Sequence, residues 1–120
     1  MAFRVDISPQ ALADLNALYL RIRQDAPENA DRWLIGITDA IYSLEDMPSR
    51  CMIAEESKDL AEEMRLLLFG RRSHAYKVYF SIQHETEAVR VFHVRHWARK
   101  NLSGDELQEL MDEFLDEEAK

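Results

Sequence analysis

The stretch of residues 64–99 most narrows what this chain can fold into, because its pattern predicts a sheet. Its β-branched and aromatic residues gather into short runs that are bounded by Gly70 and by the polar letters HETE. Such runs predict three strands, at 64–69, 75–83 and 88–94, since branched and aromatic side chains pack well on a pleated surface. Strands that follow one another this closely favour an antiparallel meander.

The same part of the chain concentrates the positive charge of an acidic protein. The whole sequence has a net charge of −8 at pH 7, whereas residues 64–102 hold eight Lys and Arg against two Glu. Residues 1–63 and residues 103–120 each have a net charge of −7. The sequence therefore predicts a basic sheet within an acidic protein, and the overall charge conceals this contrast.

Length and composition indicate one soluble domain. A chain of 120 residues can build a single hydrophobic core. No apolar run approaches the roughly 20 residues of a transmembrane helix, and the N-terminal letters lack the apolar segment of a secretory signal. We therefore expect a cytoplasmic protein with no membrane association. Cys51 is the single cysteine of the sequence, so neither an internal disulfide nor a cysteine metal site is predicted.

The letters before the sheet predict one further strand and a pair of helices. Residues 3–7 alternate apolar and polar side chains, and we expect this strand at a sheet edge or beside the last strand. Ser8, followed by proline, marks a helix start. Apolar residues at spacings of three and four then predict helices at about 9–23 and 27–47, packed as an antiparallel hairpin. The acid-rich letters of 49–63 predict a loop with one helical turn.

Alternation within the strands assigns their faces. The central strand has four large apolar residues on one face, which are Tyr76, Val78, Phe80 and Ile82. We expect this face to receive the helix hairpin. In the last strand, strict alternation places Val89 and Val91 on one face and Phe92 and Val94 on the other. Apolar residues on both faces indicate that a second layer covers the far side of the sheet.

The C-terminal segment, 103–120, predicts an acidic amphipathic helix. Residues 103–106 match the S-x-x-E capping box. Apolar residues at helical spacing follow, which are Leu107, Leu110, Met111, Phe114 and Leu115. An isolated helix of this length is marginal in water, so we expect it to pack on its own sheet or against a second copy. The alternative is that it shields the basic sheet and regulates access to it. Residues 1–102 form the main domain, with this helix as part of it or as an appendage.

The sequence lacks the usual signatures of several enzyme classes. It contains no G-x-S-x-G elbow, no P-loop and no dinucleotide fingerprint. These are the usual motifs of enzymes for acyl transfer, nucleotide hydrolysis and hydride transfer, so the sequence does not indicate any of the three activities. His93 and His96 stand three residues apart in a strand, where their side chains point to opposite faces, and no neighbouring ligands complete a metal site. We predict neither a metal nor a cofactor.

What remains is a basic cluster interleaved with aromatic residues. Guanidinium groups bind phosphates or carboxylates bidentately, and aromatic rings stack on unpaired bases. The cluster is therefore a candidate surface for RNA or for an acidic protein segment, and the sequence leaves both open. The candidate binding residues are Arg65, Lys77, Tyr79, Arg90, His93, Arg95, His96, Trp97 and Arg99. A competing interpretation is that several basic residues, such as Arg71 and Arg72, only solvate a sheet edge.

In the order of its elements and motifs, the chain resembles the RelE/ParE superfamily, the small toxins of type II toxin–antitoxin modules, which are also described as plasmid stabilisation proteins. The resemblance spans roughly residues 3–102. It rests on FRVDISPQALADL, PENADRWLIGITDAIYSLEDMP, EEMRLLLFG, AYKVYFSI and VRVFHVRHWAR, and the ParE-like branch is favoured. It implies an α+β fold of order β-α-α-β-β-β, with a helix hairpin on one face of an antiparallel sheet. It also implies a cognate antitoxin, in a complex that can be a heterotetramer, or a toxin homodimer.

The resemblance implies two possible activities. ParE-like members inhibit DNA gyrase by binding it, whereas RelE-like members cut messenger RNA on the ribosome. Carried over by position, the RNase roles would fall to Arg65, Lys77, Arg95 and His96. The tyrosine expected after the last strand of an RNase is not evident, which favours gyrase as the target. A third possibility is a non-toxic scaffold that keeps the fold for protein association.

Overall fold

The computed structural model describes residues 2–60, 62–71, 74–97, 106 and 108–112. Its strands are β1 (Arg4–Ile7), β2 (Met52–Ile53), β3 (Arg65–Phe69), β4 (Tyr76–Gln83) and β5 (Ala88–His96). Its long helices are α1 (Pro9–Asp25) and α2 (Pro27–Tyr42), and short 3₁₀ turns occupy Ser43–Glu45, Pro48–Arg50 and Glu55–Asp59. Residues 106 and 108–112 are also helical. None of the described helices is long and apolar enough to cross a membrane.

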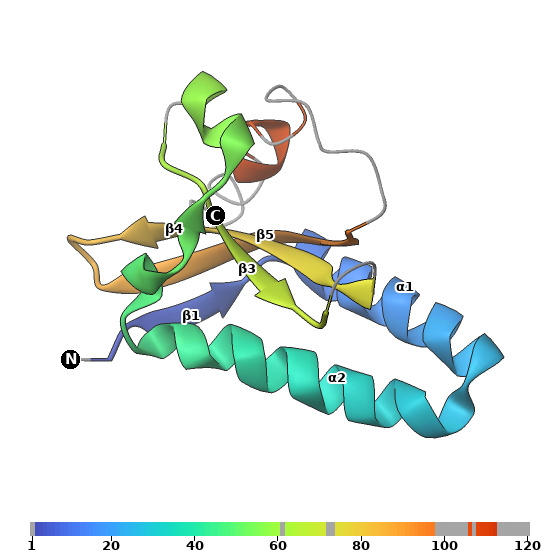
Figure 1. Cartoon of the computed structure of the whole chain (residues 1–120). Coiled ribbons are helices and arrows are strands. Elements are labelled where there is room, and N and C mark those ends of the chain that lie inside the picture. The colour runs from blue at the N-terminus through green and yellow to red at the C-terminus, as the bar shows by residue number, and fades with distance from the viewer. Residues whose placement is uncertain (1, 61, 72–73, 98–105, 107, 113–120) are drawn as a thin grey trace.

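The strands form one mixed sheet in the order β1-β5-β4-β3-β2. The pairs β3·β4 and β4·β5 are antiparallel, as the meander prediction required, and β2 also pairs antiparallel with β3. The first strand lies beside the last, also as predicted, but β1 runs parallel to β5, so the sheet is not purely antiparallel. Parallel neighbours need a long connection, and the two helices and three intervening strands supply it. The α+β fold with its helix hairpin on one face is confirmed (Figure 1).

Two elements differ from their predicted extents. The helix α2 ends at Tyr42 rather than near residue 47, and a 3₁₀ turn follows it. Met47 adopts a left-handed conformation with φ of 46°. The residue before a proline is disfavoured in the right-handed α region, so a helix does not continue through it. The segment 49–63 contains the predicted helical turn, and it also supplies β2, a two-residue strand that was not predicted.

Ser8 ties the first helix to the sheet. Its Oγ accepts a hydrogen bond of 3.0 Å from the N–H of Ala11, which is the N-cap contact that the sequence predicted. The same hydroxyl donates to the carbonyl of Phe92 in β5 at 3.2 Å. One side chain therefore fixes both where α1 begins and how it meets β5.

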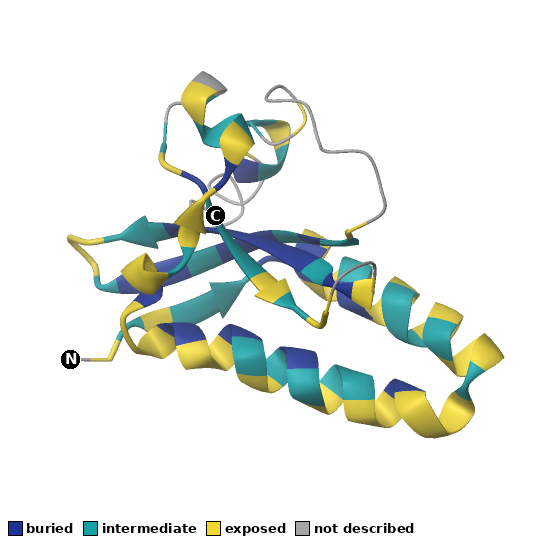
Figure 2. Ribbon diagram, viewed as in Figure 1, coloured by how far each residue is buried: buried dark blue, intermediate teal, exposed yellow. Residues whose placement is uncertain are grey.

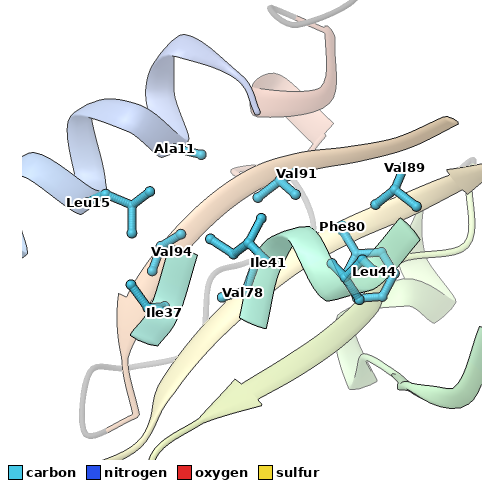
Figure 3. Close-up of a cluster of buried hydrophobic side chains, with 10 residues drawn as sticks. All are labelled: Ala11, Leu15, Ile37, Ile41, Leu44, Val78, Phe80, Val89, Val91 and Val94. Carbon is cyan, nitrogen blue, oxygen red and sulfur yellow. The ribbon is translucent and has the colours of Figure 1, made fainter. Parts of the chain in front are cut away.

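The main core lies between the helix hairpin and the sheet (Figure 3). Its buried members are Ala11, Leu15, Ile37, Ile41, Leu44, Val78, Phe80, Val89, Val91 and Val94. Tyr76 and Ile82 pack against this cluster, so the face predicted to receive the hairpin does so. Figure 2 shows the buried residues concentrated in the central strands, while the outer surfaces of α1 and α2 are exposed.

A smaller cluster covers the opposite face of the sheet. Its buried members are Ala54, Met64, Tyr79, Phe92 and Met111, with Leu60, Leu66 and Leu110 packed against them. The predicted second layer is therefore present, built by the segment 54–64 and by helical residues near 110 (Figure 1). The capping motif at 103–106 falls almost wholly outside the described residues, as do Leu107, Phe114 and Leu115.

A bulge in β5 overturns one predicted orientation. Tyr79 pairs with His93, whereas the next residue, Phe80, pairs with Val91, so Phe92 has no residue directly opposite. The extra residue reverses the alternation beyond it. Val94 therefore joins Val91 in the main core, rather than sharing the face of Phe92 as strict alternation required.

Two isoleucines on α2 test the assignment of the main core. Replacing Ile37, which is 0% exposed, by alanine should lower the free energy of unfolding by about 2–5 kcal/mol, because it leaves a cavity. Ile35→Ala removes a side chain that is 64% exposed and should change stability by about 0.5 kcal/mol or less. Urea denaturation of both variants measures the difference. Equal effects would contradict the packing described above.

Candidate functional site

The bulge brings two basic residues together on the face opposite the hairpin. Lys77 on β4 pairs directly with Arg95 on β5 and, on its other side, with Leu68 on β3. Directly opposed residues of antiparallel strands point to the same face, with Cβ atoms about 5 Å apart. These two cations, predicted from the sequence as candidate site residues, are therefore neighbours.

Lys77 is a buried cation between aromatic rings. Its side chain is only 3% exposed, and Nζ lies 5.5 Å from the ring centroid of Trp97 and 5.9 Å from that of Tyr79. Burial lowers the pKa of Lys77, the charge of Arg95 lowers it further, and the nearby carboxylate of Glu56 opposes both. The aromatic faces provide a cation–π environment for the ammonium group.

Tyr79 and Glu56 form the polar contact beneath this cation. The phenol is 1% exposed and donates a hydrogen bond to Glu56, which lies in the 3₁₀ turn Glu55–Asp59. Burial raises the pKa of Tyr79 well above its ordinary value, and the negative charge of Glu56 and the hydrogen bond raise it further. The phenol is therefore held in its protonated form.

Arg95 contributes donor groups whose bonding is incomplete. Its Nε and Nη1 are buried, and neither has a hydrogen-bond partner within the part of the chain that the structure describes. A buried guanidinium N–H without an acceptor is costly, so such groups are candidates for binding an anion. The Arg95 charge also influences both Lys77 and Tyr79.

A pocket of about 280 Å³ opens above these groups, at the edge of the sheet. Its walls are mainly apolar and are formed by Met52, Ile53, Leu66, Leu68 and Trp97. Lys77, Tyr79, Glu55 and Glu56 form its polar part. The site therefore combines apolar walls with a buried ammonium group, a combination suited to an amphiphilic ligand.

Arg65 lies apart from this pocket. It pairs with Phe80, so it points to the hairpin face of the sheet. There Nη2 contacts Glu63 at 2.8 Å, and Nη1 donates to the backbone carbonyls of Ser49 and Cys51 at 3.1 and 2.6 Å. The expectation that Arg65, Lys77 and Arg95 converge in one patch is therefore wrong, because register places Arg65 on the other face.

The two histidines also separate, as their spacing predicted. His96 pairs with Tyr76 on the hairpin side, and their rings meet edge to face with centroids 5.0 Å apart. His93 pairs with Tyr79 on the opposite face. Its Nδ1 lies 2.7 Å from Oδ2 of Asp14 on α1, and both side chains are 14% exposed.

The remaining candidates lie around these groups. Arg90 is half-buried and pairs with Ser81, which places it on the face opposite the hairpin. Trp97 is 48% exposed at the rim of the pocket. Arg99 lies outside the described residues. The face opposite the hairpin thus gathers Lys77, Tyr79, Arg90, His93 and Arg95.

Sequence reasoning missed two carboxylates of this region. Glu56 lies in a segment whose mixed periodicity predicted only a loop, and nothing in its letters indicates that it reaches Tyr79. Asp14 lies on a helix between apolar positions, yet its Oδ2 also accepts the N–H of Val94 at 3.1 Å and so completes the edge of β5. Only the tertiary arrangement assigns these roles.

Comparison with solved structures identifies the fold. A chromosomal ParDE toxin–antitoxin system from P. aeruginosa superposes with a TM-score of 0.63 at 16% identity, covering 79% of this chain and 96% of that chain. An arginine double mutant of E. coli toxin RelE in the free state gives 0.52 at 15% identity, covering 98% of both chains. The toxin–antitoxin complex RelBE2 from Mycobacterium tuberculosis gives 0.53 at 20%, covering 82% and 95%. These similarities establish a RelE/ParE-like fold.

The family follows from the sequence itself. A model of the ParE toxin of the type II toxin–antitoxin system parDE matches residues 5–101. The chain therefore belongs to the ParE toxin family, within the RelE/ParE superfamily that its motifs resemble. A search of curated proteins finds no match.

The titration of Tyr79 provides one test of the site. Because the pKa of this phenol is raised, it should stay protonated when the pH of the folded protein passes roughly 10, the ordinary value for tyrosine. Tyr79→Phe should therefore leave the tyrosinate absorbance change up to about pH 11 almost unaltered. A clear loss in Tyr79→Phe would contradict the burial of the phenol.

The buried ammonium group provides a second test. The folded-state pKa of Lys77 is lowered, so below it the burial penalty is fully present, and the penalty disappears as pH rises toward about 10.4. The free energy of unfolding of the wild type, relative to Lys77→Met, should therefore rise with pH in this window, with a slope of at most about 1.4 kcal/mol per pH unit. Lys58→Met, at an exposed position of the 3₁₀ turn, serves as the control for removing one positive charge. Urea titrations between pH 7 and 10.5 measure both differences.

Proposed function

We propose that this chain is the toxin subunit of a type II toxin–antitoxin module, that a cognate antitoxin neutralises it, and that it acts by binding DNA gyrase. The observation that carries the proposal is the match of the ParE toxin model to residues 5–101. An antitoxin partner is supported by the P. aeruginosa and M. tuberculosis structures, whose descriptions name toxin–antitoxin assemblies.

The geometry of the basic residues supports a binding function rather than RNA cleavage. Lys77 is buried beneath Trp97, and the Arg65 side chain is engaged with Glu63 and with backbone carbonyls on the other face. Cleavage of RNA by these groups would require them to surround one phosphate. Their separation removes Arg65 from any such arrangement.

A second candidate function is ribosome-dependent cleavage of messenger RNA. The direct pairing of Lys77 with Arg95 favours it, because two neighbouring cations can stabilise the charge of a pentacovalent phosphate. The incompletely bonded nitrogens of Arg95 also suit a phosphate. This candidate would use Lys77 and Arg95 without Arg65.

Induction of the chain without a partner gene separates these functions. A gyrase inhibitor should arrest growth and reduce the negative supercoiling of a reporter plasmid while transcripts remain intact. A small protein from a neighbouring gene is the antitoxin if its coexpression restores growth. Supercoiling is measured on topoisomer gels and transcript integrity by primer extension.

Substitutions at the paired cations sharpen the comparison. If the chain cleaves RNA, Lys77→Ala and Arg95→Ala should abolish cleavage, while Arg32→Ala, an exposed change on α2, should not. If transcripts are cut while supercoiling is unchanged, the target is messenger RNA and not gyrase. Unaffected growth on induction of a folded chain would overturn both activities and favour a non-toxic scaffold.

A further inference from the structure

The basic face of the sheet, opposite the hairpin, is covered in this structure. Lys77 is 3% exposed, the His93 side chain is 14% exposed, and Arg90 and Arg95 are half-buried. A stable protein interface buries about 800 Å² on each partner. These residues can contribute little to such an interface while another part of the chain lies over them.

Two segments build this second layer, and they are attached differently. The segment 54–64 is tied down by hydrogen bonds. The N–H of Ala54 donates to the carbonyl of Met64 at 2.8 Å, and the N–H of Met64 donates to Oγ of Ser57 at 2.8 Å. The strand β2, which directly precedes this segment, pairs with β3. This half of the layer is therefore continuous with the sheet.

The other half consists of the helical residues 106 and 108–112, which we call the C-terminal cover. It contacts the sheet through apolar side chains: Met111 is 1% exposed in the cluster that contains Tyr79, and Leu110 packs against that cluster. Burial of one such side chain favours the docked state roughly 10- to 100-fold. An isolated helix this short is unstable in water. The cover can therefore lift and unfold without disturbing the main core.

The C-terminal cover lies over the middle of the basic face, and Figure 1 shows this helix above β4 and β5. Its contact cluster includes Tyr79 and the bulged Phe92. Lys77 lies two residues before Tyr79 and pairs with Arg95 beyond the bulge, while Arg90 lies two residues before Phe92. Two residues of a strand span about 7 Å, and a helix with its side chains is about 10 Å wide. The cover and the long basic side chains on both sides of it therefore compete for the same space.

The C-terminal cover also reverses the charge that this face presents. Glu106, Glu109 and Asp112 are all exposed on it. Residues 103–120 have a net charge of −7, whereas residues 64–102 hold eight Lys and Arg against two Glu. The outer surface is therefore acidic while the cover is docked. Lifting the cover removes this repulsion and makes the basic strands accessible to a negatively charged partner.

We propose that the C-terminal cover is autoinhibitory: docked through Met111, it hides the basic face of β4 and β5, and the target binds the form in which the cover is lifted. This inference rests on the proposed function, because it assigns the target to that face. It also gives the acidic C-terminal segment the shielding role that the sequence left open. Since the cover and the target compete for one surface, weakening the cover strengthens binding of the target.

The test uses the full chain with Met111→Gln, which keeps the size and net charge but disfavours burial. Hydrogen exchange followed by mass spectrometry should show faster exchange in the cover and unchanged exchange in β4. Binding of a heparin hexasaccharide, a defined polyanion, should become about tenfold tighter, because the open form is no longer a minor population. Leu110→Gln provides a second variant with a smaller effect in the same direction. Met47→Gln, at a position 73% exposed, is the matched control and should change neither measurement.

Further substitutions assign the gain in affinity to the basic face. In the Met111→Gln background, Arg95→Met should remove most of the gain, whereas Arg32→Met, at an exposed position of α2, should retain it. Glu109→Gln removes one exposed charge from the cover without detaching it, and should change heparin binding by much less than tenfold.

A supercoiling assay with purified DNA gyrase separates a failure of this inference from a failure of the proposed function. If both are right, Met111→Gln should inhibit gyrase at about a tenth of the concentration that the wild type requires. Tighter heparin binding without gyrase inhibition by either protein would support the cover and reject gyrase as the target.

Three outcomes would overturn the cover whatever the target is. The first is faster exchange in Met111→Gln with unchanged heparin binding. The second is unchanged exchange in both Met111→Gln and Leu110→Gln, which would show that these side chains do not hold the helix. The third is an equal gain in affinity in Glu109→Gln, which would make the effect one of charge alone.

Discussion

The bulge at Phe92 is the constraint on which the rest of the sheet depends, because β5 is covered on both faces and every residue after the bulge changes sides. Before it, Val89 and Val91 face the hairpin; after it, Val94 does so as well, while Phe92 fills the second cluster. Without the extra residue, Arg95 would face the hairpin core and could not meet Lys77. The same irregularity therefore completes two hydrophobic clusters and assembles the cationic pair.

The second face of the sheet shows how an acidic protein accommodates basic strands. Its cations do not form an exposed patch; segments rich in carboxylates, 54–64 and the helical residues near 110, cover them. Carboxylates lie close to two of its basic residues: Glu56 acts on Lys77, and Oδ2 of Asp14 lies 2.7 Å from Nδ1 of His93. Buried charges without such partners would cost several kcal/mol each. The opposite net charges of the segments thus reflect packing inside the molecule as well as its outer surface.

The predictability of each feature follows from how local its cause is. The hairpin, the N-cap at Ser8 and the face of β4 were predictable because continuous periodicity encodes them over neighbouring residues. The bulge was not predictable, because a bulged residue requires no particular amino acid. It becomes evident only from the pairing with the neighbouring strand. The face of Arg95 depends on this bulge, and the face of Arg65 depends on the pairing of β3 with β4, so the predicted single patch divided. The contact of Glu56 with Tyr79 depends on where a loop folds back, which periodicity does not specify.

Stability alone gives no reason for an ammonium group at position 77. A methionine of similar length would fill the same volume between Trp97 and Tyr79 without removing a charge from water. Burial lowers the pKa of Lys77, which means that the folded protein bears a cost for keeping this group charged. Costs of this kind concentrate at sites that bind or react, because a ligand of opposite charge removes them. We therefore propose that the functional part of the sheet is the edge where β3, β4 and β5 meet Trp97, next to Lys77 and Arg95, rather than the whole length of the basic strands.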